Sequence, residues 1–158
     1  MRPTTQVSGG NRIAHRMRQI KENLHKNSAV YVGLPKGAGT YEDGAPIAVI
    51  GAVHEFGSAD GHIPERSFLR VPLRAERKEF GKIIKMQIPR IMDGQLTSRD
   101  VMEQVGAKAV GVSQEAISAG IQPPNAPSTV RRKGSATPLI DTGALRQNIT
   151  YVIEEGDE

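Results

Sequence analysis

The chain has 158 residues, of which 37% are apolar and 24% charged, so its size and composition are those of one globular domain. The absence of Cys excludes disulfides and thiolate metal sites, and a reducing cytoplasm would therefore suit the protein. A net charge of +4 is compatible with a polyanion nearby, but a charge this small does not by itself indicate nucleic-acid recognition.

The sequence contains no pattern of a targeting or membrane segment. Residues 1–10 lack the apolar core of a signal peptide, and no apolar run approaches the length of a membrane span. We therefore expect neither secretion nor membrane insertion. The sequence predicts a flexible leader over 1–10 and one α+β domain over 11–158.

Three elements are predicted in the first 56 residues. A helix over 11–26 with one buried stripe is indicated by apolar residues at helical spacing, namely Ile13, Met17, Ile20 and Leu24. β-branched and aromatic residues predict a strand over 29–34, which a Gly-rich loop over 35–39 ends. Segment 46–56 has the Val and Ile content of a strand, but its apolar residues share one helical face and Pro46 suits a first turn, which favours a short helix.

Two long helices are predicted in the middle of the chain, after Pro64 has kept residues 63–70 extended. The first is marked by an apolar face made of Leu73, Phe80, Ile84, Ile88 and Ile91. Pro89 is expected to kink or end it. The second runs from Ser98 to Ala119 with Ser98 as its N-cap. Two glycines inside it, Gly106 and Gly111, either weaken the helix or allow close packing.

The C-terminal part is predicted to contain an arm, a short helix and a strand. Residues 120–138 carry several prolines and no hydrophobic period, which indicates an irregular extended arm, and a loop of this length is usually functional or disordered. Asp141 is expected to cap a helical turn over 142–147. The alternation over 149–153 predicts a strand, followed by an acidic tail.

Together these elements predict an α+β fold, in which a small sheet packs with several helices and a long extended arm precedes the C-terminal helix and strand. Two strands alone do not form a stable sheet. Either further strands exist, or the sheet is completed between subunits.

No catalytic, cofactor-binding or metal-binding set emerges from the sequence. The Asp-Thr-Gly step at 141–143 resembles the signature of retroviral-type aspartic proteases, but only 15 residues follow it. Helix capping by Asp141 is therefore favoured over a hydrolase that uses this carboxylate. His54 begins a zinc-protease pattern, but Ser58 stands where the second His is required. The glycines over 33–39 lack the Gly-Lys-Ser/Thr step of a phosphate-binding loop.

A basic segment runs from Arg66 to Arg90, with eight Lys or Arg residues against two Glu. Four of the basic residues recur at four-residue steps and so share one flank of the predicted helix: Arg70, Arg74, Lys78 and Lys82. This flank is either a solvated helix face or a surface that faces phosphates or an acidic neighbour. The same two interpretations apply to the Arg-Arg-Lys run at 131–133.

Three stretches of the sequence carry a resemblance to a known family. They are Glu-Phe-Gly at 55–57, Ile-Pro-Glu-Arg-Ser-Phe-Leu-Arg at 63–70, and the stretch 126–145, which contains Pro-Ser-Thr, Arg-Lys-Gly and Pro-Leu-Ile-Asp-Thr-Gly. In order and spacing they resemble the virion-morphogenesis and tail-completion proteins of long-tailed bacteriophages, over roughly residues 30 to 153. Glu65 and Ser67 stand where that family commonly has prolines, which loosens the middle loop.

The resemblance implies a structural subunit of the phage neck rather than an enzyme. Such a subunit forms a ring, a hexamer or dodecamer, between the portal-adaptor stack and the tail or at the top of the tail tube, and DNA passes through it. The implied partners are further copies of the chain, the portal-adaptor or connector proteins, and the tail terminator or tail tube proteins. No cofactor and no membrane are implied, and the protein is expected in the virion after assembly in the host cytoplasm.

Docking to other subunits or partners is assigned to the loop 56–70 and to the arm. The residues expected to dock are Phe56, Ile63, Pro64, Phe68, Leu69, Arg70, Pro123, Pro124, Pro127, Arg131, Arg132, Lys133 and Leu139. The residues that could face DNA are Arg74, Lys78, Lys82 and Lys85. A basic helix and an acidic C-terminus are complementary surfaces of the kind that head-to-tail rings use. Two other interpretations are a tail terminator that caps the tail tube and a non-specific nucleic-acid-binding protein.

Overall fold

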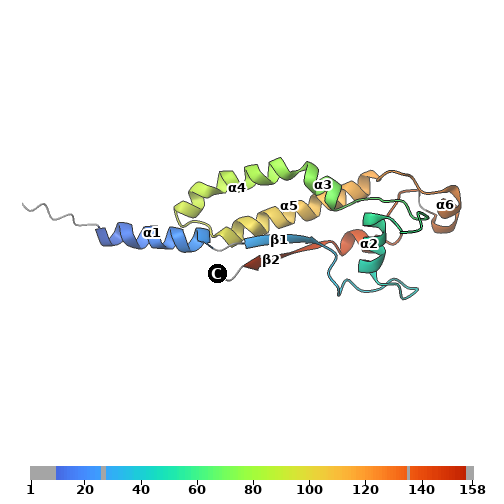
Figure 1. Cartoon of the computed structure of the whole chain (residues 1–158), viewed down its shortest axis with the longest axis horizontal. Helices are drawn as coiled ribbons and strands as arrows, with labels where there is room; N and C mark the ends of the chain where they lie inside the picture. The colour runs from blue at the N-terminus through green and yellow to red at the C-terminus, as the bar shows by residue number, and fades with distance from the viewer. Residues whose placement is uncertain (1–9, 26–27, 135, 156–158) are drawn as a thin grey trace, which may run out of the picture.

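The computed structural model describes residues 10–25, 28–134 and 136–155 and shows an elongated α+β molecule (Figure 1). Its centre is a two-stranded antiparallel sheet of β1 (Ser28–Gly33) and β2 (Thr150–Glu155). This arrangement, in which the terminal strand pairs with the early one and helices pack against the sheet, confirms the predicted α+β class. Residues 1–9 of the leader predicted over 1–10 and the end of the acidic tail over 156–158 lie outside the described residues, whereas Gly10 is the first residue of a helix.

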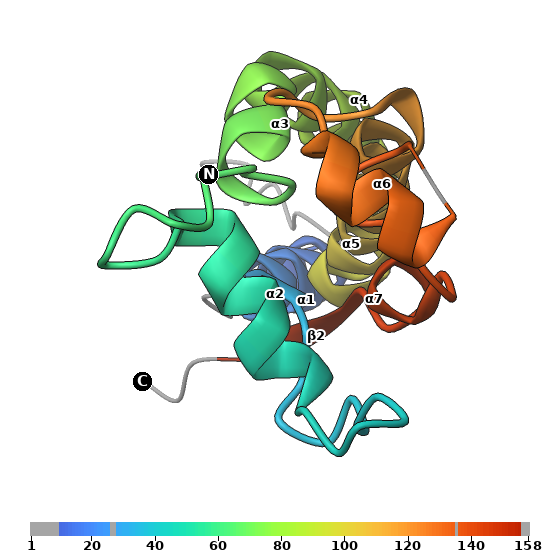
Figure 2. The same ribbon diagram turned by 90° about the vertical axis from the view of Figure 1, so that its right-hand side faces the viewer.

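The sheet has one covered and one open face. Helix α5 (Ser98–Ala119) packs along both strands, and helix α4 (Arg77–Met92) lies on the far side of α5 (Figures 1 and 2). On the open face Tyr31 stands opposite Val152, and these side chains are 57% and 54% exposed. Beyond β1 and β2, the described residues contribute only an isolated bridge between Thr40 and Pro46. Completion of the sheet between subunits therefore stays a prediction.

The single helix predicted to begin near Leu73 is in fact two helices. Helix α3 (Arg70–Ala75) is followed by Glu76 as its C-cap, and the Glu76 amide donates a hydrogen bond of 3.1 Å to the carbonyl of Pro72. Helix α4 starts at the next residue. Pro89 does not end α4, which continues to Met92. The physical reason is Ile91, which lies in this last turn and is buried, so its packing holds the turn in helical form.

Helix α5 has the predicted bounds but a different N-cap. The hydroxyl of Thr97 accepts a hydrogen bond from the amide of Asp100, and the Asp100 carboxylate accepts one of 2.7 Å from the amide of Thr97. This reciprocal pair is a capping box, and it replaces the cap predicted at Ser98. The hydrogen bonds to Thr97 also lower the pKa of the exposed Asp100 carboxyl.

Helix α1 (Gly10–His25) has nearly the predicted bounds, but its apolar stripe is not buried as expected. The helix extends from one end of the molecule, away from the other elements (Figure 1). It meets α4 through an ion pair of 2.9 Å between Arg16 Nη2 and Asp93 Oδ1. Farther out, Ile13 and Met17 are 67% and 65% exposed, and the side chain of Leu24 lies outside those described.

The main core lies at the opposite end of the molecule, seen end-on in Figure 2, where α2 (Ile47–Phe56) meets α7 (Ala144–Gln147). Helix α2 confirms the helix predicted over 46–56. The buried residues of this core are Ala38, Ile47, Phe68, Ile117, Leu139, Leu145 and Ile149. None of the described helices combines the length and apolar character that a membrane crossing requires.

Candidate functional site

The three stretches that carry the family resemblance meet at the α2 end of the molecule. Glu55 at the end of α2 holds the loop 63–70 by hydrogen bonds, and Arg66 of that loop binds the start of the arm. Phe68 of the same loop shares the core with Leu139 and Leu145 from the third stretch. Segments far apart in the sequence therefore form one structural unit, which we take as the candidate site for interactions.

The centre of this unit is the buried carboxylate of Glu55, which is 3% exposed. Its Oε1 accepts hydrogen bonds from Ser67 Oγ (2.6 Å), the amide of Arg70 (2.9 Å) and Arg70 Nε (3.1 Å). Its Oε2 accepts from the amides of Phe68 (2.8 Å) and Leu69 (2.9 Å). We call this set of five hydrogen bonds the Glu55 node. It fixes the loop where the chain enters α3, and so it sets the direction of everything that the loop presents.

Opposing effects act on the pKa of Glu55. Burial raises the pKa, but the hydrogen bonds from Ser67 and from the amides of Arg70, Leu69 and Phe68 together outweigh burial and leave the pKa below its ordinary value. The folded state therefore favours the ionised form. Ionised Glu55 is the form that holds the loop together.

This lowered pKa predicts an acid-sensitive contribution to stability. The contribution is fully present above the ordinary glutamate pKa of about 4.3 and is lost as the pH falls through the lowered value of the folded state. We expect wild type to be more stable than Glu55→Gln at neutral pH and the difference to shrink below about pH 4.3, because Gln cannot ionise. Urea denaturation of both proteins over a pH series measures this difference. A difference that stays constant down to acid pH would contradict the assignment.

Arg70 extends the node to the surface. Its Nη2 donates to the backbone carbonyl of Glu55 (3.0 Å) and to Glu65 Oε1 (2.8 Å), and its guanidinium lies 4.5 Å from the ring centroid of Phe56. The Phe56 ring is exposed at the tip of α2. A rigidly held Arg over an outward aromatic ring is the kind of pair that is enriched at the centres of protein interfaces.

Arg66 ties the arm to the body. It is buried, and its Nε and Nη2 donate to the carbonyls of Pro123 (2.7 Å) and Pro124 (3.0 Å). Burial lowers the pKa of the Arg66 guanidinium. The beginning of the arm is thus held by charge-assisted hydrogen bonds.

The sequence predicts an extended arm over 120–138, but part of this arm is helical. Residues from Pro127 to Lys133 form helix α6, with Pro127 in its first turn and Gly134 in the left-handed conformation at its C-terminus. The prediction was wrong because it depended on hydrophobic periodicity, which a helix this short does not show. Such a helix is indicated by the residues at its two ends, here Pro127 and Gly134. Arg131 is exposed, whereas the side chains of Arg132 and Lys133 lie outside those described.

The predicted helix cap at Asp141 is wrong. Helix α7 begins at Ala144 with Gly143 as its N-cap, and no side chain caps it in the usual way. Gly143 adopts a left-handed backbone, with φ of 83°, and the helix begins two residues later than predicted. The nearest equivalent of a cap is a long hydrogen bond of 3.3 Å from the amide of Ala144 to Thr142 Oγ1.

Two residues predicted to dock are core residues. Phe68 is fully buried and Leu139 nearly so, because both fill the space between α2, α5 and α7. Both side chains stabilise the unit. Phe68 is not offered to a partner, whereas the slightly exposed edge of Leu139 lines the hollow described below. The exposed residues of the predicted docking set are Phe56, Ile63, Pro64, Arg70, Pro123, Pro124, Pro127 and Arg131, and Leu69 is partly buried.

The basic flank predicted to face DNA is split between two elements. Arg74 is in α3, whereas Lys78, Lys82 and Lys85 are in α4, and all four are exposed. Lys82 pairs with Glu79 on the same helix. Arg70, which belongs to the same four-residue series, is held in the Glu55 node.

A hollow that the sequence did not predict lies along another side of α2, with a volume of about 560 Å³. We call it the acidic groove, since three carboxylates and an apolar floor line it: Tyr41, Glu42, Asp43, Ile50, Leu139 and Asp141. Burial, and then the charges of Asp141 and Asp43, raise the pKa of Tyr41. No local pattern could have revealed this groove, because only the fold brings residues 41–43 next to Asp141.

Among residues 10–25, 28–134 and 136–155, no group of three His, Cys, Asp or Glu side chains could hold a metal ion. The chemistry of the site is that of packing, hydrogen bonding and charge. No protein-family model, curated protein or solved structure matches the chain.

Proposed function

We propose that the chain is a structural protein of the neck of a long-tailed bacteriophage, a tail-completion subunit that forms a ring at the head-tail junction around the passage for DNA. The observation that supports this most is the meeting of the three resembling stretches in one unit. Motifs that resembled the family by chance would have no reason to be joined by the Glu55 node and by a shared core.

A second support is what this unit presents to the outside. The Glu55 node holds the Phe56 ring and the Arg70 guanidinium rigidly at the surface, and Arg66 fixes the base of the arm beside the prolines that it binds. Rigid anchors lose little entropy on association, which favours a role in assembly. The open face of the sheet adds further apolar surface at Tyr31 and Val152.

The test of this function is the assembled state. We expect purified protein, or protein mixed with connector and tail components, to form rings whose mass is six or twelve times the 17.1 kDa of the chain. Sedimentation and electron microscopy measure this, and mass spectrometry of purified particles should find the chain in the virion. Particles made without it should be filled heads and separate tails. A chain that stays monomeric in every mixture and is absent from purified particles would overturn the proposal.

A tail terminator remains the alternative within the same class. Loss of a terminator leaves tail tubes without a cap, whereas loss of a completion protein leaves capped tails that do not join heads. Electron microscopy of particles that lack this chain therefore separates the two roles.

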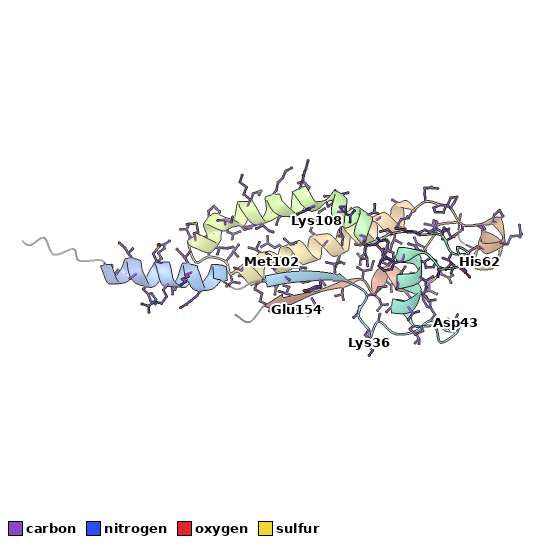
Figure 3. All side chains as sticks on the ribbon, viewed as in Figure 1. Lys36, Asp43, His62, Met102, Lys108 and Glu154 are labelled. Carbon is purple, nitrogen blue, oxygen red and sulfur yellow. The ribbon has the colours of Figure 1, made fainter. Side chains whose placement is uncertain are left out.

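The exposed basic flank favours one candidate from a different class, a non-specific nucleic-acid-binding protein. If this flank contacts phosphates, replacing Lys78 and Lys85 with Gln should reduce the slope of log K against log salt by about two, since each phosphate contact contributes about 0.9. Fluorescence anisotropy with a DNA duplex over a salt series measures the slope. The matched control is Lys108→Gln, an exposed Lys on α5 (Figure 3). Equal slopes for all proteins would contradict the DNA interpretation.

A further inference from the structure

Helix α1 carries an apolar surface that the described residues of its own chain do not cover. Ile20 lines a hollow beside Ile91 and Met92 at the end of α4, so this part of the stripe has neighbours. One and two turns farther out, Met17 and Ile13 are 65% and 67% exposed. Two large side chains on one face of a protruding helix are unfavourable in water, and covering each is worth more than a factor of ten in affinity.

The surroundings of this stripe are basic. At 100° per residue, Lys21 lies on one side of the line through Ile13 and Met17, and Arg16, which is paired with Asp93 of its own chain, lies on the other. Arg12 and Arg18 lie farther round, and Glu22 is the single acidic residue among those of α1 whose side chains are described. The free part of α1 is therefore a basic amphipathic helix, which suits a partner surface that is apolar at its floor and acidic at its rim.

The acidic groove has this combination. Its floor is formed by Ile50 and Leu139, and its rim by the carboxylates of Glu42, Asp43 and Asp141. The lining that the structure describes contains no Lys or Arg, and His54 is its one basic side chain. The groove also offers about 560 Å³ of open space, enough for large side chains such as Ile and Met.

The two surfaces lie at opposite ends of the same molecule. Figure 3 shows Asp43 at the α2 end, whereas α1 extends from the other end of the long axis. One molecule therefore does not bring its own α1 into its own groove. We propose that the groove binds α1 of a second copy of this chain, with Ile13 and Met17 on its apolar floor and the basic residues of α1 against Glu42, Asp43 and Asp141.

This contact is heterologous, because it joins different surfaces of two identical chains. Repeated contacts of this kind close into a ring when the rotation allows and otherwise give an open filament. The inference builds on the proposed ring assembly and names its contact. Apart from Leu139, it differs from the docking predicted from the sequence, which involved the loop 56–70 and the arm. It can be measured on the purified chain without any phage particle.

The experiment uses the full chain with one surface changed at a time. The α1 variant is Ile13→Ser with Met17→Ser, and the groove variant is Asp43→Lys with Asp141→Lys. All four positions are exposed, so both variants should fold, which circular dichroism checks. We expect wild type to associate with increasing concentration in sedimentation velocity, and more tightly at low salt. The affinity of the α1 variant should be at least about 100-fold lower than that of wild type, since this variant lacks two apolar anchors.

The decisive measurement is a mixture of the two variants. Each alone should be monomeric, but the α1 variant keeps a groove and the groove variant keeps its α1. Together they should form a one-to-one dimer that grows no further. The control Met86→Ser removes a methionine of α4 that is somewhat more exposed than Met17, and it should associate as wild type does. A photo-crosslinker at position 17 should attach to peptides that contain residues 41–43 or 139–142.

Three results would overturn the inference. They are a wild type that remains monomeric at high concentration, a mixture of variants that stays monomeric, and crosslinks that fall on the loop 56–70 instead. The proposed function has separate outcomes. If the pure chain associates head to tail but is absent from phage particles, the proposed contact holds and the proposed function is wrong. If the chain is found in particles but its copies are joined by other surfaces, the proposed function holds and the proposed contact is wrong.

Discussion

Replacement of Glu55 by Ala will lower the free energy of unfolding by about 3–5 kcal/mol, because it removes one partner of a buried, charge-assisted network. The change leaves the amides of Phe68, Leu69 and Arg70 without the acceptor that they now share. Each buried donor without a partner costs about 1–3 kcal/mol. It also removes the acceptor of Arg70 Nε, whereas Arg70 Nη2 keeps its hydrogen bond to the backbone carbonyl of residue 55.

Urea denaturation at neutral pH measures this loss, and Glu65→Ala is the matched control. Glu65 binds the same Arg70 at 2.8 Å, but its side chain is about half exposed, so its removal should cost no more than about 1 kcal/mol. A comparable loss in the two variants would mean that Glu55 acts as an ordinary surface ion pair. We also expect residues 63–70 to become sensitive to proteolysis in Glu55→Ala before the rest of the chain does.

Those parts of the fold that depend on local periodicity could be predicted from the sequence. Helices α1, α2 and α5 follow from apolar residues at helical spacing, and β1 and β2 follow from β-branched alternation. The burial of the α1 stripe was predicted wrongly because that prediction also depended on periodicity alone. Periodicity shows that a face is apolar, but only the tertiary arrangement shows whether the same chain covers it, and here α1 extends away from the body.

The errors at helix ends have separate causes. Thr97 and Asp100 form the pattern of a capping box, so the correct cap of α5 was present in the sequence and Ser98 was a misreading by one residue. Pro89 was expected to kink or end α4. It does not end the helix, because the burial of Ile91 holds the last turn, and the kink stays a prediction. Asp141 failed as a cap because Gly143 takes up the left-handed turn that starts α7, a choice of backbone geometry that composition does not reveal.

The Glu55 node could not have been predicted, because its partners lie 12–15 residues away on an irregular loop. The sequence held one signal, a Glu inside an otherwise apolar helix, and a buried carboxylate requires donors. Nothing local indicates that the donors are three successive amides. The same is true of the acidic groove, whose carboxylates come from both ends of the sequence. The residues that resemble the family are mostly those that hold the candidate site together. Which side chains the site exposes to a partner is decided by the tertiary fold.

The contact between α5 and the sheet gives the second large effect. Gly106 faces Tyr151 on β2, and a Cβ at position 106 would lie 2.4 Å from Tyr151 Cδ2 and 2.6 Å from Cγ. Carbon atoms in proteins normally approach to about 3.5–4.0 Å, so Gly106→Ala forces either the ring or the strand to move. Because Cγ is near the root of the side chain, rotation alone does not relieve the clash. We expect a loss of about 1–3 kcal/mol, measured by urea denaturation.

Gly111→Ala is the control on the same helix, since a Cβ at position 111 meets no atom within 4 Å. There the greater helix propensity of Ala should raise the stability by about 0.5–1 kcal/mol. Opposite signs for two identical substitutions five residues apart would show that Gly106 is required for close packing and not for flexibility. If both substitutions stabilised the protein, α5 would lie farther from the sheet than the structure places it.

The distance between α5 and the sheet also matters for assembly, because α5 spans the body between the α1 end and the α2 end. A tilt of α5 would misalign the two surfaces of a head-to-tail contact. Gly106→Ala should then weaken self-association as well, whereas Gly111→Ala should leave it unchanged.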